Sequence, residues 1–143
     1  MAYRITAQRV ERDQALREHI LDCAVQQVAD GGFSSLTMSA LARNAGIATG
    51  SLYRHFSGKG ELAAEVFVKA TRLELETLKQ QFQAKGRAAD RLRNGLTQFA
   101  ARAWHSRQLA YALIAEPAEE EVETRRLHYR QAYASLYGEL IAE

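Results

Sequence analysis

Proline limits helix formation more than any other residue, and this chain contains one, Pro117, in 143 residues. Strong helix formers such as Ala, Leu, Glu, Arg and Gln are plentiful instead. No stretch alternates β-branched and polar residues, as a half-exposed strand would. Apolar residues recur every three or four positions along most of the chain. The sequence therefore predicts an all-α protein.

The apolar periodicity and its interruptions divide the chain into seven expected helices. Glycines close several of them, because glycine readily adopts the left-handed conformation that ends a helix. The long fourth helix carries two apolar faces, which is typical of a helix that packs against two different neighbours and joins two structural units. The expected ranges are residues 6 or 8 to 30, 37–45, 49–56, 59–85, a helix between Gly86 and His105, 107–115 and 119–142.

Several classes of protein are disfavoured by the composition. No run approaches the roughly 18 apolar residues of a membrane span, and the polar N-terminus lacks the apolar part of a secretory signal. The single cysteine, Cys23, cannot form an internal disulfide or a multi-cysteine zinc site. No paired carboxylates, phosphate-binding loop or nucleophile with a nearby base indicates an enzyme. We expect a cytoplasmic protein with no cofactor, metal or catalytic residue.

The distribution of charge is uneven, although the net charge is only +2. The first 60 residues hold seven Lys and Arg against five Asp and Glu, so the whole excess lies there. A basic excess is weak evidence for contact with nucleic acid when it stands alone. It adds to the motif that lies in the same region.

Residues 33–62 have the features of a helix-turn-helix, in which two short helices are joined by a tight turn. Thr37 stands where an N-cap is needed, since its hydroxyl can accept a hydrogen bond from the first turn of the helix. Ala42 and Ala45 are small enough for a close helix crossing. Gly46 can turn the chain, and Ile47 supplies an apolar plug after it.

The second helix of this motif has one apolar and one polar side. Leu52 and Phe56 are four residues apart and can anchor it inside, while Gly50 permits close approach of the backbone. Some outward groups can hydrogen-bond base edges: Thr49, Ser51 and Arg54. Others can hold phosphates at the edge of a groove: Tyr53, His55 and Lys59, with Thr37 presenting a helix N-terminus.

The run LTMSALARNAGIATGSLYRHFSGKGEL resembles the DNA-binding signature of the TetR family of bacterial transcriptional regulators. The resemblance implies a DNA-binding domain over residues 1–58, with 49–56 as its recognition helix. It implies a helical effector-binding and dimerisation domain over residues 59–143. The family's DNA contacts correspond here to Thr37, Thr49, Gly50, Ser51, Tyr53, His55 and Lys59.

The resemblance also implies a function: a ligand-responsive repressor that binds double-stranded DNA at a palindromic operator as a homodimer. Such a protein associates with the nucleoid, responds to a small-molecule effector and moves its long helix like a lever. This sequence departs from the family pattern at Ala48, where a Ser or Thr cap is common, and at Gly60, where an acid is usual. Family members continue with two further helices, so the second domain is expected to be incomplete at its C-terminus.

Aromatic residues of the second unit are either core residues or the lining of an effector pocket, because Trp and Tyr combine an apolar face with a polar group. The candidate pocket residues are Phe99, Trp104, His105, Tyr111, Tyr129 and Tyr133. Three of them surround a predicted bend near His105-Ser106. The alternative function is a helical protein-interaction module in which the helix-turn-helix serves packing alone, and the polar character of Thr49, Ser51 and Arg54 disfavours it.

Overall fold

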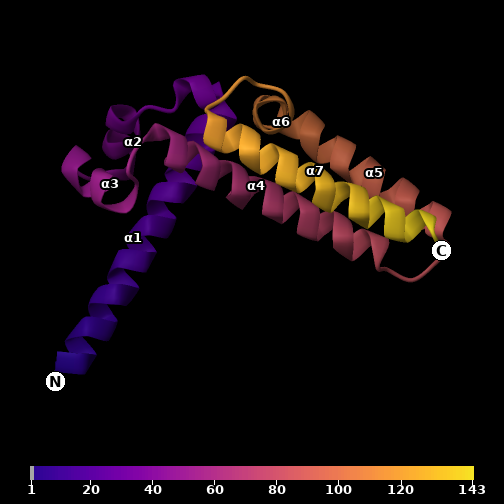
Figure 1. Ribbon diagram of the computed structural model, residues 1–143, viewed down its shortest axis with the longest axis horizontal. Helices are drawn as coiled ribbons and strands as arrows, with labels where there is room; N and C mark the ends of the chain where they lie inside the picture. The colour runs from indigo at the N-terminus through magenta and orange to yellow at the C-terminus, as the bar shows by residue number, and fades with distance from the viewer. Residues whose placement is uncertain (1) are drawn as a thin grey trace.

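The computed structural model describes residues 2–143, with side chains from Thr6 onward. Over this range the secondary structure is entirely helical, which confirms the predicted all-α class. The elements, shown in Figure 1, are α1 (Ala2–Gly31), the 3-10 turn η1 (Phe33–Ser35), α2 (Met38–Ala45), α3 (Thr49–His55), α4 (Lys59–Phe82), α5 (Ala88–His105), α6 (Arg107–Ile114) and α7 (Glu120–Ile141).

Figure 1 shows two regions with different shapes. At one end, α2 and α3 fold beside the second half of α1, whose first half extends away from the rest of the molecule. We call this region, residues 2–58, the head. At the other end α4, α5 and α7 run alongside one another, with α6 closing the top near the head. We call residues 59–143 the bundle. The long α4 follows the head directly and forms one side of the bundle.

The principal core lies in the head and extends into the start of the bundle. Phe33, Leu52 and Phe56 are at most 1% exposed, and they pack with residues of α1 and α4 in one cluster. Ala112 of α6 and Val122 of α7 belong to the same cluster. A smaller core at the far end of the bundle contains Leu78, Phe82 and Leu140. The head and the bundle are therefore not separated by a solvated linker.

The predicted helices are found with small shifts at their ends. The first begins at Ala2, several residues earlier than expected, and the fourth ends at Phe82. The two apolar faces predicted for the fourth helix are buried or partly buried. The exception is Leu73, which is 68% exposed and is part of the lining of a pocket. In the described part of the chain, no helix has both the length and the apolar character needed to cross a bilayer.

Candidate nucleic-acid interface and ligand pocket

The turn between α2 and α3 is built by the residues that the sequence indicates. The Thr37 hydroxyl accepts a hydrogen bond from the Ala40 amide at 3.2 Å and so caps α2. Gly46 has φ 72°, a left-handed conformation that suits glycine, and ends α2. The Ile47 amide donates back to the Ala42 carbonyl at 3.0 Å. These contacts fix the direction in which α3 leaves the turn.

Two buried anchors and one arginine fix α3 on the head. Leu52 is fully buried and Phe56 is 1% exposed. The Arg17 guanidinium of α1 lies 4.2 Å from the Phe56 ring centroid and donates a 2.6 Å hydrogen bond to the His55 carbonyl. Arg17 also pairs with Glu65 of α4. Sequence reasoning missed this arginine, which joins three helices, because its partners are far away in the chain.

The outward side of α3 is polar and accessible. Tyr53 is 51% exposed, in agreement with the prediction that it faces outward. The Arg54 guanidinium donates to the Ser51 hydroxyl at 3.0 Å, so these two side chains lie together on the surface. Among the predicted DNA contacts, the exposed ones are Thr37, Thr49, Gly50, Tyr53 and Arg54, and the partly exposed ones are Ser51, His55 and Lys59.

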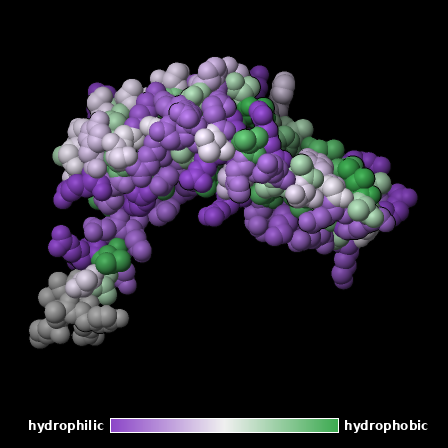
Figure 2. Space-filling view, in the orientation of Figure 1, coloured by the Kyte–Doolittle hydropathy of each residue, from purple (hydrophilic) through white to green (hydrophobic). Residues whose placement is uncertain are grey.

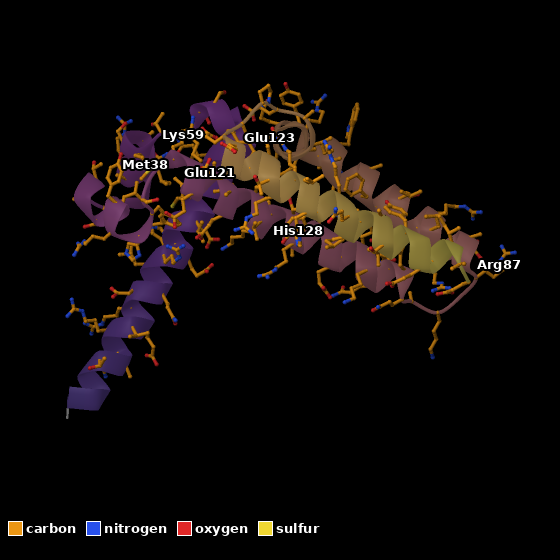
Figure 3. All side chains as sticks on the ribbon, viewed as in Figure 1. Met38, Lys59, Arg87, Glu121, Glu123 and His128 are labelled. Carbon is orange, nitrogen blue, oxygen red and sulfur yellow. The ribbon has the colours of Figure 1, made fainter. Side chains whose placement is uncertain are left out.

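The start of α4 meets the start of α7, as the labelled Lys59 and Glu121 in Figure 3 show. Lys59 Nζ lies 3.2 Å from a carboxylate oxygen of Glu119, so this predicted phosphate contact has an acidic partner. A side chain at Gly60 would collide with the Glu121 carboxyl, 2.6 Å from its Cβ. The Glu121 side chain is exposed and can move aside, so this contact alone does not require glycine at position 60. Ala48, the other departure, gives α3 no side-chain cap.

Ion pairs also hold the first part of α4 against α1. The Lys69 ammonium lies 2.7 Å from Glu18 and 2.8 Å from Asp22. The hydrogen bonds that its ammonium donates to Asp22 and to Glu18 raise the pKa of Lys69, because they stabilise its charged form. Together with the pair between Arg17 and Glu65, these ion pairs connect α1 to the first half of α4.

A buried glutamate connects the bundle to the head. Glu116, in the α6–α7 connection, is 7% exposed and accepts hydrogen bonds from the Phe33 amide (2.8 Å) and the Ser34 amide (3.1 Å). Gly32 has φ 78°, and a side chain there would lie 2.7 Å from the Glu116 carboxylate oxygens. The carboxylate therefore caps η1 in a site that requires glycine. We call this contact the Glu116 latch.

Arg126 of α7 holds the segment that carries the latch. It is 6% exposed, and its guanidinium donates to the carbonyls of Ala112 (2.6 Å), Leu113 (3.3 Å) and Glu116 (2.6 Å). It also pairs with Glu123. A buried arginine is thus satisfied by the end of α6 and the chain that follows it. The sequence offered no signal for either Glu116 or Arg126, because both act through backbone groups that only tertiary packing brings near.

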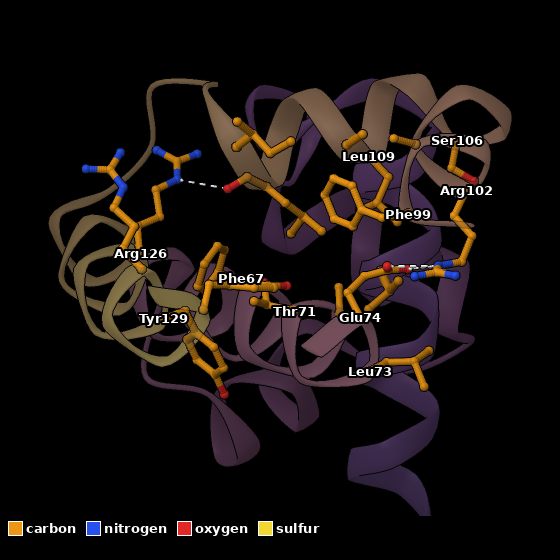
Figure 4. A pocket seen from close by; sticks show the side chains of 18 of the residues that line it. Phe67, Thr71, Leu73, Glu74, Phe99, Arg102, Ser106, Leu109, Arg126 and Tyr129 are labelled. Carbon is orange, nitrogen blue, oxygen red and sulfur yellow. Dashed lines mark hydrogen bonds and ion pairs between the residues drawn. The ribbon is translucent and has the colours of Figure 1, made fainter. Parts of the chain in front are cut away.

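A cavity of about 400 Å³ lies between α4, α5, α6 and α7, and Val25 of α1 also contributes to its lining (Figure 4). In this view Thr71 and Glu74 rise from α4, with Phe99 and Leu109 on the opposite wall. Its volume falls in the range of small-molecule sites. Arg126, which holds the latch segment, is part of its lining.

The structure brings half of the predicted pocket residues to this cavity. Phe99, Tyr129 and Tyr133 line it. Trp104, His105 and Tyr111 do not: their side chains are exposed, at 69% for Trp104 and 52% for Tyr111. The inward face of α5 is set by residues at helical spacing, Phe99, Arg102 and Ala103, which leaves positions 104 and 105 on the outside. The bend itself contributes Ser106 to the lining.

The polar groups of the pocket were missed by sequence reasoning. Arg102 Nε of α5 donates to both carboxylate oxygens of Glu74 in α4, at 3.1 and 2.9 Å. Burial and the nearby Glu74 charge raise the pKa of Tyr133 to about 12, so its hydroxyl remains protonated at neutral pH. Over residues 2–143, no group of three His, Cys, Asp or Glu side chains is placed to bind a metal ion.

Comparison with known proteins identifies the family to which the helix-turn-helix segment is similar. Residues 20–66, from α1 through the first part of α4, match the family model for bacterial regulatory proteins of the tetR family. Residues 20–66 are therefore assigned to the TetR family. The matched segment contains the helix-turn-helix and both helices that support it, so the resemblance seen in the sequence is confirmed.

Curated relatives match the same end of the chain. The HTH-type transcriptional regulator AcrR of Shigella flexneri is 33% identical over 72 residues, which are 50% of this chain and 33% of that protein. The fatty acid metabolism regulator protein of Bacillus subtilis is 27% identical over 73 residues, or 51% of this chain and 38% of that protein. The matched segment spans little more than a third of these relatives.

Solved structures extend the likeness to the bundle. FadR from Bacillus subtilis, in complex with stearoyl-CoA, superposes with a TM-score of 0.73 and 20% identity, over 87% of this chain and 68% of that one. A TetR-family regulator from Agrobacterium tumefaciens gives a TM-score of 0.73 and 19% identity, over 91% and 73%. At these identities the shared property is the fold, which includes the helices around the cavity.

Proposed function

We propose that this chain is a ligand-responsive transcriptional repressor that binds a specific DNA sequence and acts without catalysis. The observation that carries the proposal is α3, whose apolar side is buried through Leu52 and Phe56 while its polar side faces solvent. A helix of this kind at the surface of a helix-turn-helix is suited to the major groove. In this proposal residues 1–58 read DNA, and residues 59–143 bind the effector and support dimerisation.

The side chains of the head divide into two roles in this proposal. Thr49, Ser51 and Arg54 contact base edges and set the sequence preference, with Gly50 allowing the backbone to approach. The remaining groups, Thr37, Tyr53, His55 and Lys59, contact phosphates and position the helix. Loss of a base contact should change which sequence is preferred, and loss of a phosphate contact should weaken binding to all sequences.

Two copies of the chain bind a palindromic operator in this proposal, with the recognition helices about 34 to 36 Å apart in successive major grooves. The exposed apolar residues of the bundle, such as Leu127 and Ile141 on α7, are available for contact with a second copy. The protein would then act at the nucleoid, where its operator lies.

The cavity in the bundle is the proposed effector site. FadR of Bacillus subtilis, whose structure contains stearoyl-CoA, shares the fold and supports the binding of a small molecule in this region. The cavity is joined to the head by α4, by Val25 of α1 in its lining, and by the Glu116 latch held by Arg126. An effector regulates DNA binding only if it binds more tightly to the form that fits DNA poorly.

Fluorescence-anisotropy binding to genomic fragments, including the DNA upstream of the chain's own gene, tests the proposal. The titration is run with non-specific competitor across a salt series, because phosphate contacts give a steep salt dependence. Tyr53→Ala is the informative variant and Tyr111→Ala is its control, since both tyrosines are about half exposed and only Tyr53 belongs to the head.

We expect saturable, competitor-resistant binding to a palindromic fragment, weakened at least about tenfold by Tyr53→Ala and unchanged by Tyr111→Ala. If the folded Tyr53→Ala variant bound as tightly as the parent, the assignment of α3 as the reading helix would be wrong. Failure of the folded, dimeric protein to bind any fragment above the non-specific level would favour the protein-interaction module instead.

A further inference from the structure

We propose that the cavity of the bundle selects an apolar molecule ending in a single carboxylate, held at its charged end by Arg102 and Thr71. The regulatory meaning of this ligand rests on the proposed function, whereas its binding does not. The inference comes from three independent features of the cavity: its apolar walls, its unpartnered hydrogen-bond donors and its balance of charge.

Most of the cavity surface is apolar. The apolar lining includes Phe67, Phe99, Leu109 and Leu113, of which Figure 4 labels the first three. Burial of apolar ligand area against such walls is favourable in proportion to the area removed from water. The walls therefore fit a hydrocarbon or aromatic body, and the few polar groups decide which end group accompanies it.

Two donors of the lining have no protein partner among the described residues. The Thr71 hydroxyl oxygen is buried, with the residue 6% exposed, and it forms no hydrogen bond. Arg102 Nη2 is also buried without a partner, because Glu74 is bound by the Nε of the same guanidinium. Buried polar groups are normally satisfied, and leaving one unpaired is costly. A ligand oxygen that accepts from these groups would satisfy both.

Both donors belong to the part of the lining around Glu74. Thr71 and Glu74 are three residues apart on α4, so they share one face of the helix. Arg102 is bonded to Glu74, which brings its guanidinium to the same turn. Figure 4 shows Thr71 and Glu74 side by side, with the Arg102 guanidinium beside the carboxylate. One carboxylate could therefore accept from the α4 hydroxyl and the α5 guanidinium at once.

The charge of the lining favours an anion. Three arginines, Arg102, Arg126 and Arg130, face the cavity with one acid, Glu74. Arg126 is occupied by carbonyls and Glu123, so Arg102 is the arginine with a buried free donor. An ammonium ligand would meet this positive lining without a free carboxylate to receive it. A carboxylate gains a charge-assisted hydrogen bond, the stronger kind.

Isothermal titration calorimetry without DNA tests the end group directly, with three probes that share one apolar body: decanoate, decanamide and decylammonium. We expect decanoate to bind at least about tenfold more tightly than decanamide, since a charge-assisted hydrogen bond contributes more than a neutral one. Decylammonium should bind most weakly. Decanoyl-CoA is a fourth probe, which places a thioester at the same position.

Thr71→Val and Arg102→Gln identify the donors. Thr71→Val keeps the shape of the side chain, and Thr97→Val is its control on the exposed side of α5. Arg102→Gln keeps a donor for Glu74, and Arg93→Gln is its exposed control. Each test variant should reduce the preference for decanoate over decanamide at least about threefold, while the controls leave it unchanged. Circular dichroism and thermal unfolding verify that every variant is folded.

Four outcomes would overturn the proposal: no binding by any probe, affinities within threefold of one another, a preference for decanoate that survives both test variants, or tighter binding of decanoyl-CoA than of decanoate. The anisotropy titration is run separately on the same protein. DNA binding without carboxylate preference would reject this ligand class alone, and carboxylate preference without DNA binding would reject the repressor alone.

Discussion

The head and the bundle use the same kind of helix in different ways. In the head, α2, α3 and the second half of α1 enclose a dense core in which Phe33, Leu52 and Phe56 are almost fully buried. In the bundle, α4 to α7 surround a cavity and leave large apolar side chains on the surface, and Figure 2 shows green patches over this region. The exposed set in the bundle comprises Leu73, Leu96, Trp104, Tyr111, Ile114, Leu127 and Ile141.

This difference indicates how each region is constrained. The relation of α3 to α1 is fixed by interlocking contacts: a capped turn, buried anchors and the Arg17 cluster. The bundle helices are held mainly at their two ends, by the principal core near the head and by the small core around Leu78 and Phe82. The cavity between these two cores is therefore less densely packed than the core of the head.

The largest effect is expected from removing a head anchor. Phe56→Ala should lower the free energy of unfolding by about 3–5 kcal/mol, because it leaves a cavity in a dense core and removes the ring beneath Arg17. Phe99→Ala, on the partly exposed wall of the bundle cavity, should cost less than half as much. Chemical denaturation of both variants measures the difference. Equal losses would remove the distinction between the two regions.

Breaking the contact between the regions should have the next largest effect. Glu116→Gln keeps the size of the side chain but replaces one of the two acceptor oxygens with an NH2 group, which cannot accept from the Phe33 or Ser34 amide, at a cost of about 1–3 kcal/mol in stability. The latch should also transmit any effect of ligand on DNA affinity, so that effect should shrink in the variant. Glu76→Gln, exposed on α4, is the control for both measurements. Unchanged stability would show that the latch contributes little.

A smaller effect on DNA binding is expected from removing either charge of the ion pair between Lys59 and Glu119. Lys59→Gln should weaken DNA binding about threefold to tenfold on all sequences and reduce the salt slope by about one unit. Glu119→Gln should do the opposite, by about twofold to threefold, since it removes the carboxylate 3.2 Å from Lys59. Anisotropy titrations measure both, with Lys85→Gln at the far end as control. Effects of the same sign would mean that this ion pair does not compete with phosphate.

The smallest effect is expected on the pKa of Glu61, a carboxylate in the first turn of α4. Hydrogen bonds from the Ser57 hydroxyl (2.6 Å) and amide (2.7 Å) lower the pKa of Glu61 below its ordinary value of 4.5. The resulting stabilisation is present above pH 4.5 and is lost as the pH falls through the lowered pKa. Ser57→Ala should move the pKa of Glu61 part of the way back, as measured by a carboxyl NMR titration. Ser135→Ala should leave it in place.

Features encoded in neighbouring residues were predictable from the sequence. The Thr37 cap, the turn at Gly46 and the anchors Leu52 and Phe56 each depend on spacing within a few positions, and the structure confirms all of them. The helix ends were located to within a few residues for the same reason, except at the start of α1, where no capping residue or glycine marks the boundary.

Features that depend on tertiary packing were not predictable. Arg102 and Glu74 are separated by 28 positions, and the Glu116 latch by 82 or 83. The orientation of α5 was also ambiguous, because its most buried position is Gly95, against Phe82, rather than a large apolar residue. The aromatic residues near the bend were therefore predicted to line the pocket, whereas in the structure other side chains of α5 line it.

Trp104 is the single tryptophan of the chain, and its position makes it an intrinsic fluorescent probe of the α5–α6 bend. Its indole is exposed near the α5–α6 bend, with the Arg107 guanidinium 5.0 Å from its ring, and it does not line the cavity. A ligand inside the cavity would not touch it, so a change in its emission would report movement of the bend rather than direct quenching. Rapid-mixing fluorescence on unlabelled protein could therefore time that movement.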